Sequence, residues 1–174
     1  MFRVTKNRII WGANYFSQHL PPARNWIVWD KMQPDGVTFA AHELAYCDGG
    51  KKPLIFRANP AIEKNSVSNG DRRQATANRR IHVNQKPIAL YEWLLRNYAK
   101  PGQTILDTHM GSGSIAIACY NMGFDLTACE LDADYYAAAM KRIEAHIQKH
   151  PRGADLQPKT VTLNNQLPLQ FFTD

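Results

Sequence analysis

With 174 residues, the chain is long enough for one ordinary domain and too short for a multidomain assembly. Its composition, 44% hydrophobic and 21% charged, is that of a globular protein, and no apolar run reaches the roughly 18 residues of a membrane span. The net charge of +6 favours a polyanionic partner, whereas three cysteines without Cys-x-x-Cys spacing argue against a disulfide framework and a zinc site. We expect a cytoplasmic protein that holds no metal and no membrane segment.

Three short strands are predicted in the first part of the chain. They are Arg8–Trp11 (RIIW), Trp26–Trp29 (WIVW) and Glu43–Cys47 (ELAYC). Turn signals separate them, namely Gly12, the two prolines of Leu20–Ala23, and Asp35-Gly36. Continuous apolar runs of this length are typical of strands covered on both faces, so we expect all three to be buried in a sheet.

Positive charge is concentrated in the next segment. Residues 51–86 contain nine basic and two acidic side chains, a net charge of +7, so the remainder of the chain is at −1. The stretch from Asp48 to Asn84 shows little periodicity, and we expect it to lack regular structure, which at about 35 residues usually indicates function or disorder. A focused basic segment indicates a polyanionic partner, and a merely solvated loop is the alternative.

Helices and strands alternate in the second half. Helices are predicted from Pro87 to the residues before Pro101-Gly102, over Ser114–Met122, and over Ala133–His150. Strands are predicted at Thr104–Leu106, at Leu126–Cys129 and around Thr160–Leu163. This order implies a parallel sheet with helices on its faces, an α/β fold.

A glycine turn between a strand and a helix is the main candidate for chemistry. The strand delivers Asp107, the turn contains Gly111 and Gly113, and a helix N-terminus with free N–H groups follows. Glu130 ends the next strand 23 residues after Asp107, where a carboxylate can accept hydrogen bonds from a ribose diol. Neither a P-loop lysine nor the G-x-G-x-x-G spacing is present, and a turn that only packs helix on strand is the alternative.

Three segments carry a resemblance to a known family. They are His82–Pro87 (HVNQKP), Asp107–Ser114 (DTHMGSGS) and Glu130–Asp132 (ELD), in this order and spacing. Together they resemble the C-terminal half of the β-class, permuted DNA amino-methyltransferases, which use S-adenosylmethionine to methylate adenine N6 or cytosine N4. The stretches RIIWGANYF and WIVWDK further resemble phage-type adenine members. The resemblance implies a three-layer, Rossmann-like S-adenosylmethionine-dependent methyltransferase fold with a mostly parallel sheet, N-terminally truncated, in one domain over residues 1–174.

The resemblance also implies roles for single residues. The ribose would be bound by Glu130, the cofactor adenine would lie near Asp132, and the cofactor carboxylate would lie near Lys86. The full cofactor-binding set would be Asp107, His109, Gly111, Ser112, Gly113, Glu130, Asp132, His82, Gln85, Lys86 and Pro87. The basic insertion at about 48–84 would recognise double-stranded DNA, because arginines grip phosphates and read guanine edges. The DNA-binding residues in it would be Lys51, Lys52, Arg57, Arg72, Arg73, Arg79 and Arg80.

One part of the family pattern has no counterpart in this sequence. The family's catalytic tetrapeptide, Asp/Asn/Ser-Pro-Pro-aromatic, holds the target amine and stacks on the flipped base. Leu20–Ala23 has the two prolines but neither the polar acceptor nor the aromatic, so we assign no catalytic residue. In the family, the strand with the tetrapeptide pairs beside the strand that corresponds to Thr104–Leu106. We expect the two strand sets to meet directly, or a second copy or partner chain to fill the gap.

These observations predict a homologue of adenine-N6 DNA methyltransferases of restriction–modification systems, encoded by a bacterium or phage. Without the tetrapeptide, we expect it to be inactive alone. The alternative is a catalytically silent DNA-binding or partner-binding protein. A small-molecule methyltransferase is a third reading, which the +7 segment argues against.

Overall fold

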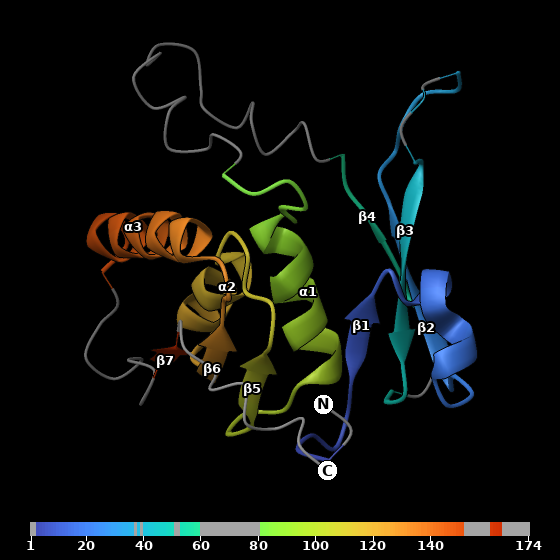
Figure 1. The fold of residues 1–174 in the computed structure, drawn as a ribbon, viewed down its shortest axis with the longest axis horizontal. Coiled ribbons are helices and arrows are strands. Elements are labelled where there is room, and N and C mark those ends of the chain that lie inside the picture. The colour runs from blue at the N-terminus through green and yellow to red at the C-terminus, as the bar shows by residue number, and fades with distance from the viewer. Residues whose placement is uncertain are drawn as a thin grey trace. The chain divides into compact units, whose positions relative to one another are not determined.

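The computed structural model describes residues 3–36, 38, 40–50, 53–59, 81–151 and 161–164. The chain divides into two compact units, residues 1–71 and 72–174, and each is described by itself (Figure 1). The single domain with an insertion at about 48–84 stays a prediction. Within the described ranges, no helix is long and apolar enough to cross a membrane.

The first unit is built around a four-stranded sheet in the order β1-β3-β2-β4. Its elements are β1 (Ile9–Trp11), the 3₁₀ segment η1 (Ala13–His19), β2 (Asn25–Asp30), β3 (His42–Cys47) and β4 (Ile55–Arg57). The central strand β3 is antiparallel to both β1 and β2, and β4 is parallel to β2. Gly12 has a φ of 72° where the chain leaves β1, as its predicted turn requires.

Two expectations for this unit are corrected. The stretch from Asp48 to Asn84 was expected to lack regular structure, yet β4 lies in it, because three residues are too few to show a period. The two pairs that β3 makes are antiparallel, since β3 returns to β2 through the turn at Gly36, a connection too short for a parallel crossover. The side chains of β2 alternate between buried and half-buried, so this strand is not covered equally on both faces.

The second unit has the predicted alternation of helices and parallel strands. Its elements are α1 (Ile88–Tyr98), β5 (Thr104–Asp107), α2 (Ser114–Met122), β6 (Asp125–Cys129), α3 (Ala133–Lys149) and β7 (Val161–Asn164). The strands pair in the order β5-β6-β7, all parallel. The predicted bounds of α2 are those observed, because Gly113 and Gly123 occupy left-handed conformations at its two ends.

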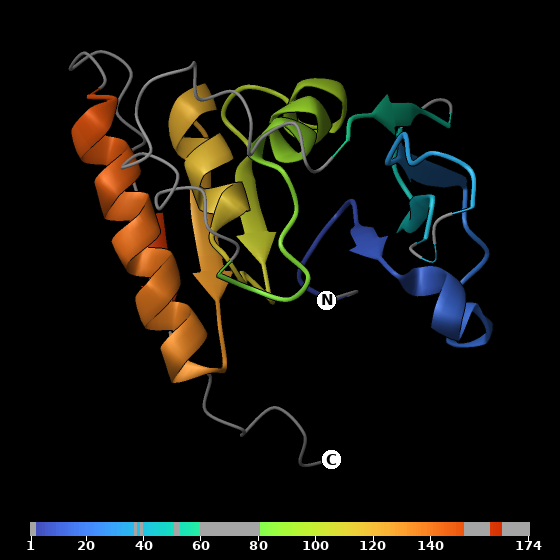
Figure 2. The ribbon, with the colours of Figure 1, turned by 90° about the horizontal axis from the view of Figure 1, so that it is seen from above.

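Helix α2 forms the centre of the second unit's core. Residues 114–120 are all buried, since α2 contacts α1, α3 and β6 (Figure 2). The small side chains of Ala116 and Ala118, 1% and 0% exposed, let the neighbouring elements approach closely. Leu126 on β6 and Ile143 on α3 complete this core, and burial of each stabilises the fold by roughly 1.5–3 kcal/mol.

Candidate functional site

The glycine turn begins at the carboxyl end of β5. The Oδ1 atom of Asp107 accepts a hydrogen bond from the backbone N–H of His109 at 3.0 Å. The N–H of Met110 donates to the carbonyl of Cys129 at 2.8 Å, which ties the turn to the end of β6. Gly111 and Gly113 have φ angles of 56° and 73°, a region that other residues rarely adopt. The turn therefore needs glycine at both positions.

Glu130 lies against this turn. Its Oε2 atom accepts from the N–H of Gly111 at 2.7 Å, and its Oε1 atom accepts from the N–H of Asp132 at 3.1 Å. The parallel pairing of β5 with β6 brings the carboxyl ends of both strands to one edge of the sheet. A carboxylate offers about four acceptor positions, so Glu130 keeps acceptor capacity for hydroxyl groups of a ligand.

The segment 82–87 borders the same turn. A Cβ atom added to Gly111 would lie 3.4 Å from the ring of His82, and that ring packs on Tyr135 with centroids 4.4 Å apart. The carbonyl of Lys86 accepts from the hydroxyl of Ser114 at 2.8 Å. The three segments singled out in the sequence are thus brought together within the second unit.

The other predicted members of this segment have structural contacts of their own. Gln85 closes its turn by accepting from the N–H of Ile81 at 3.0 Å. Pro87 is buried and precedes the first residue of α1 with a φ of −59°. Both residues therefore fix how the segment enters α1.

The Asp107 carboxyl is held in an electrostatically mixed environment. Burial raises its pKa above the ordinary value, and the charge of Glu130 acts in the same direction. The hydrogen bond from the His109 amide and the positive charges of His109 and Lys86 oppose this shift. Such a shifted carboxyl beside a glycine turn is typical of a functional site.

Two of the predicted cofactor residues, Asp132 and His109, also make hydrogen bonds within the protein. The Oδ1 atom of Asp132 accepts from the N–H groups of Asp134 and Tyr135, each at 2.9 Å, so Asp132 is the N-cap of α3. His109 is exposed, and its ring Nδ1 lies 2.9 Å from the hydroxyl of Thr108. The backbone of His109, and not its ring, binds to the turn, because its N–H donates to Asp107.

Arg142 was not predicted. It lies on α3, and one guanidinium nitrogen donates to the carbonyl of Ser112 at 2.8 Å and to the hydroxyl of Ser114 at 2.9 Å. The sequence offers one signal, because Arg142 interrupts the face of the amphipathic helix that buries Ala139 and Ile143. A charged side chain beside a buried face is expected to have a hydrogen-bond partner within the protein, but the helical spacing does not identify that partner.

Comparison with known proteins decides the family. A sequence model of the DNA methylase family matches residues 5–141. The chain belongs to the DNA methylase family. The family comprises DNA methyltransferases of adenine N6 or cytosine N4, so the predicted membership is confirmed at this level.

Two curated DNA methylases resemble this one. The type II methyltransferase M1.MboII of Moraxella bovis is 26% identical over 157 residues, covering 64% of this chain and 59% of that protein. The type II methyltransferase M.HpaI of Haemophilus parainfluenzae is 29% identical over 68 residues, covering 39% of this chain and 22% of that protein. The chain thus spans less than two thirds of the length of either relative.

Solved structures confirm the predicted Rossmann-like methyltransferase fold. The crystal structure of the M1.HpyAVI–SAM complex matches with a TM-score of 0.56 and 21% identity, covering 79% of this chain and 74% of that one. A second crystal structure of M1.HpyAVI matches with a TM-score of 0.52 and 19% identity over the same shares.

Of the basic residues predicted to bind DNA, the structure describes Arg57. Its side chain is 63% exposed on β4 and forms an ion pair with Asp30, with Nε and Oδ2 3.3 Å apart. The other members lie outside the described residues: Lys51, Lys52, Arg72, Arg73, Arg79 and Arg80. Their role in this DNA methylase stays a prediction.

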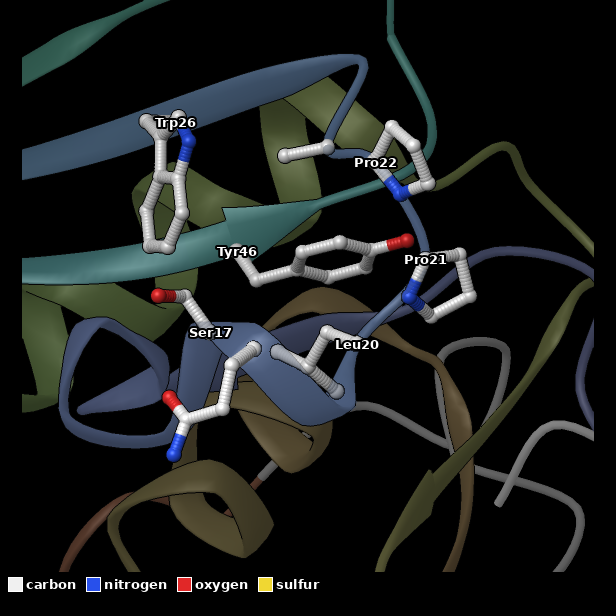
Figure 3. Close-up of a pocket in the computed structure, with 8 residues that line it drawn as sticks. Ser17, Leu20, Pro21, Pro22, Trp26 and Tyr46 are labelled. Atoms are coloured by element: carbon white, nitrogen blue, oxygen red, sulfur yellow. The ribbon is translucent and has the colours of Figure 1, made fainter.

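A cavity of about 300 Å³ lies elsewhere, in the first unit (Figure 3). Leu20–Ala23 forms part of its wall, with Ser17, Gln18, Trp26 and Tyr46. The rings of Trp26 and Tyr46 meet edge to face with centroids 6.3 Å apart. None of the predicted cofactor residues lines this cavity, so it does not mark the glycine turn.

Proposed function

We propose that this DNA methylase binds S-adenosylmethionine at the turn from Asp107 to Ser114. The observation that carries the proposal is the contact between Glu130 and Gly111, which fixes a carboxylate with spare acceptor capacity beside a turn of two left-handed glycines. A ligand with a ribose diol suits this arrangement, since both hydroxyls donate to one carboxylate.

The surrounding residues fit the other parts of that cofactor. No side chain caps the N-terminus of α2, so its backbone N–H groups can meet the cofactor carboxylate, with the charge of Lys86 nearby. Because Gly111 has no side chain, the ring of His82 can pack closely against the turn, which keeps the segment that carries Lys86 beside it. When bound, the cofactor supplies a methyl group activated by a sulfonium. The protein's part is to bind and orient it.

The remaining members of the proposed cofactor set surround this contact. Ser112 and Gly113 shape the turn, and Asp132, whose N–H donates to Glu130, fixes the start of α3. Gln85 and Pro87 hold the segment that carries Lys86. Asp107 and the backbone of His109 would face the methionine part of the cofactor.

The acceptor that we propose is the exocyclic N6 amine of adenine in double-stranded DNA. Support comes from the stretches RIIWGANYF and WIVWDK, which resemble phage-type adenine enzymes of the permuted class. An enzyme of this kind flips its base out of the duplex and aligns the amine with the methyl group. The basic segment at about 48–84 would hold the phosphates, as expected for a bacterial or phage enzyme that acts on DNA in the cytoplasm.

We propose that the amine-positioning tetrapeptide is supplied by another segment or chain. The sequence of 174 residues contains no Asp-Pro-Pro-aromatic tetrapeptide. Strands β1 and β5 each lie at an edge of their sheet in the described part of the chain, so each offers backbone groups to a further strand. A segment or partner chain that carries the tetrapeptide and pairs with one of these edge strands would complete the site, whereas a second copy of this sequence could supply a strand but not the tetrapeptide. The alternative, a catalytically silent DNA-binding protein, would need no such strand.

Calorimetric titration with S-adenosylmethionine tests the cofactor site. We expect saturable binding that Glu130→Ala weakens by roughly tenfold or more, because the ribose hydroxyls lose a charged hydrogen-bond acceptor. Glu144→Ala, which removes an exposed carboxylate from α3, is the matched control and leaves binding unchanged. Equal affinity of Glu130→Ala and the original protein would contradict the proposed site.

Methyl transfer from tritiated cofactor tests the reaction. We expect the 174-residue chain to label duplex DNA only when a segment with the tetrapeptide is added, and to label adenine N6 rather than cytosine N4 on digestion. Labelling by the chain alone would refute the need for a further strand. Labelling of cytosine alone would refute the choice of base, and no labelling under either condition would favour the silent alternative.

A further inference from the structure

Three parts of the second unit meet at the hydroxyl of Ser114. Ser114 is 2% exposed, and a buried hydroxyl requires hydrogen-bond partners. It donates to the carbonyl of Lys86 at 2.8 Å, and it accepts from the guanidinium of Arg142 at 2.9 Å. The hydroxyl of Ser112 lies 3.2 Å away.

The donors and acceptors at this point can be assigned. A serine hydroxyl has one hydrogen and two acceptor positions. The hydrogen of Ser114 is directed to Lys86, because a carbonyl cannot donate, and Arg142 can only donate. Ser112 must then be the donor in its contact with Ser114. Every position on Ser114 is filled, so the contact has a single arrangement.

Arg142 also fixes the backbone of the turn directly. Its guanidinium donates to the carbonyl of Ser112 at 2.8 Å, between Gly111 and Gly113. Glycines on both sides give this peptide more conformational freedom than any other residue would, and ordering it costs entropy. A hydrogen bond from α3 that holds the Ser112 carbonyl removes part of that freedom before a ligand arrives.

The positive charge of Arg142 does not stabilise α2, the helix whose first turn it contacts. Ser114 is the first residue of α2, and a cation at a helix N-terminus opposes the helix dipole. The same position favours an anionic group bound at that N-terminus. The location of Arg142 is thus better explained by ligand binding than by the stability of α2.

We propose that Arg142 is a positioning residue that holds the glycine turn in the form that binds S-adenosylmethionine. It acts through Ser112 and Ser114 and needs no contact with the cofactor itself. The proposal rests on the proposed function of the turn. Preorganisation of this kind raises affinity because less ordering entropy is lost on binding.

Two measurements on Arg142→Ala and Arg142→Lys test this role. Calorimetry well below the unfolding temperature should show S-adenosylmethionine binding weakened roughly ten- to a hundredfold in Arg142→Ala, as expected for loss of charged hydrogen bonds. Arg142→Lys, which keeps one donor and the charge, should recover part of the affinity. Amide hydrogen exchange without ligand should be faster at residues 111–114 in Arg142→Ala. Lys141→Ala removes an equal charge from the exposed side of α3 and should change neither readout.

The outcomes separate this proposal from the proposed function. Unchanged affinity in Arg142→Ala overturns the positioning role while the cofactor site stands. If the original protein binds no S-adenosylmethionine, the proposed function fails, and hydrogen exchange decides alone: unchanged exchange in Arg142→Ala overturns the positioning role too. Should Arg142→Ala not fold, Arg142→Lys and Ser114→Ala replace it, and original affinity in both would overturn the proposal.

Discussion

At Asp107, the proposed ligand binding and the stability of the fold are in opposition. Burial raises the pKa of this carboxyl, so its ionised form is less favourable in the folded protein than in the unfolded chain. The folded state holds more protons between the ordinary and the raised pKa, and stability falls as pH rises through that window. Above the window the full destabilisation persists. A buried charge kept at such a cost is consistent with a binding role.

We expect Asp107→Asn to be more stable than the original protein at pH 7 and to bind S-adenosylmethionine more weakly. The amide oxygen can still accept from His109, but no buried charge remains. The stability gain should shrink as pH falls through this window and vanish below about 3.9, the ordinary pKa of aspartate, where the original carboxyl becomes neutral in both states. Urea unfolding at several pH values measures this. A gain independent of pH would show that burial of the charge is not its cause.

The contribution of His146 to stability is expected to depend on pH in the opposite direction to that of Asp107. Its pKa is lowered, first by burial and then by the charges of His150 and Arg142. Its Nε2 lies 2.8 Å from Oδ1 of Asn121, whose Nδ2 donates to Glu92 at 2.6 Å. Because Nδ2 of Asn121 is the donor to Glu92, Oδ1 is the acceptor and His146 carries its hydrogen on Nε2.

We expect the protein to lose stability as pH falls from about 7 to 5.5, and His146→Gln to lose less. A lowered folded-state pKa means that the stabilisation is present above the ordinary pKa and is lost as pH falls below it. Glutamine can still donate to Asn121 but does not titrate. The unfolding midpoint in urea is the readout, with His42→Gln, an exposed site on β3, as control. Parallel pH profiles for His146→Gln and the original protein would contradict the assignment.

Among the elements, the junction of the glycine turn with α2 is the most constrained. Gly113 has a φ of 73°, and a Cβ atom there would lie 2.9 Å from Cδ1 of Ile143 on α3. Gly102 has a φ of 81° with open space around it. The two positions share the backbone requirement and differ in packing. Comparison of the two separates the contribution of conformation from that of helix packing.

We expect Gly102→Ala to cost about 1–2 kcal/mol of unfolding free energy, the strain of a left-handed conformation. Gly113→Ala should cost roughly 1–3 kcal/mol more, because it also overpacks the contact between α2 and α3. In the background of Ile143→Val, which lacks Cδ1, the extra cost should fall. Urea unfolding of the single and double variants measures the coupling. Equal losses of unfolding free energy in Gly102→Ala and Gly113→Ala would show that α3 shifts to accommodate the added methyl group without cost.

The charge of the whole molecule is uneven, which leads to a prediction for the proposed binding to DNA. The net charge of the chain is +6, and the segment 51–86 alone has a net charge of +7, so the remainder is at −1. Each phosphate neutralised by a basic side chain releases counterions, so affinity falls with salt in proportion to the number of neutralised phosphates. A segment that binds phosphates therefore changes the salt dependence, whereas charge spread elsewhere contributes less.

We expect alanine at Arg72, Arg73, Arg79 and Arg80 to weaken duplex binding at low salt. The slope of log affinity against log salt should become shallower by up to about 3.6, or roughly 0.9 for each phosphate that is no longer neutralised. The matched control replaces four exposed basic residues outside the segment: Lys6, Arg24, Arg96 and Lys141. Fluorescence anisotropy over a range of salt provides the slopes. The same slope change in both quadruple variants would indicate that only net charge matters.

Much of the second unit and its site could be predicted from sequence because the signals are local. Glycines mark both ends of α2, and proline and helical spacing mark α1. Asp107, Gly111 and Glu130 could be identified because parallel strands bring their carboxyl ends to one edge, a rule that holds without coordinates. Local chemistry therefore determined these elements and the residues of the turn.

Tertiary structure alone decided which distant groups meet. Strand β4 exists through its pairing with β2, since three residues have no period of their own. The antiparallel place of β3 follows from the pairs that it makes with β1 and β2. Arg142 reaches Ser112 and Ser114 from 30 and 28 residues away, and helical spacing shows that a face is buried but not what covers it. Side-chain contacts across elements depend on packing in three dimensions, which no local pattern encodes.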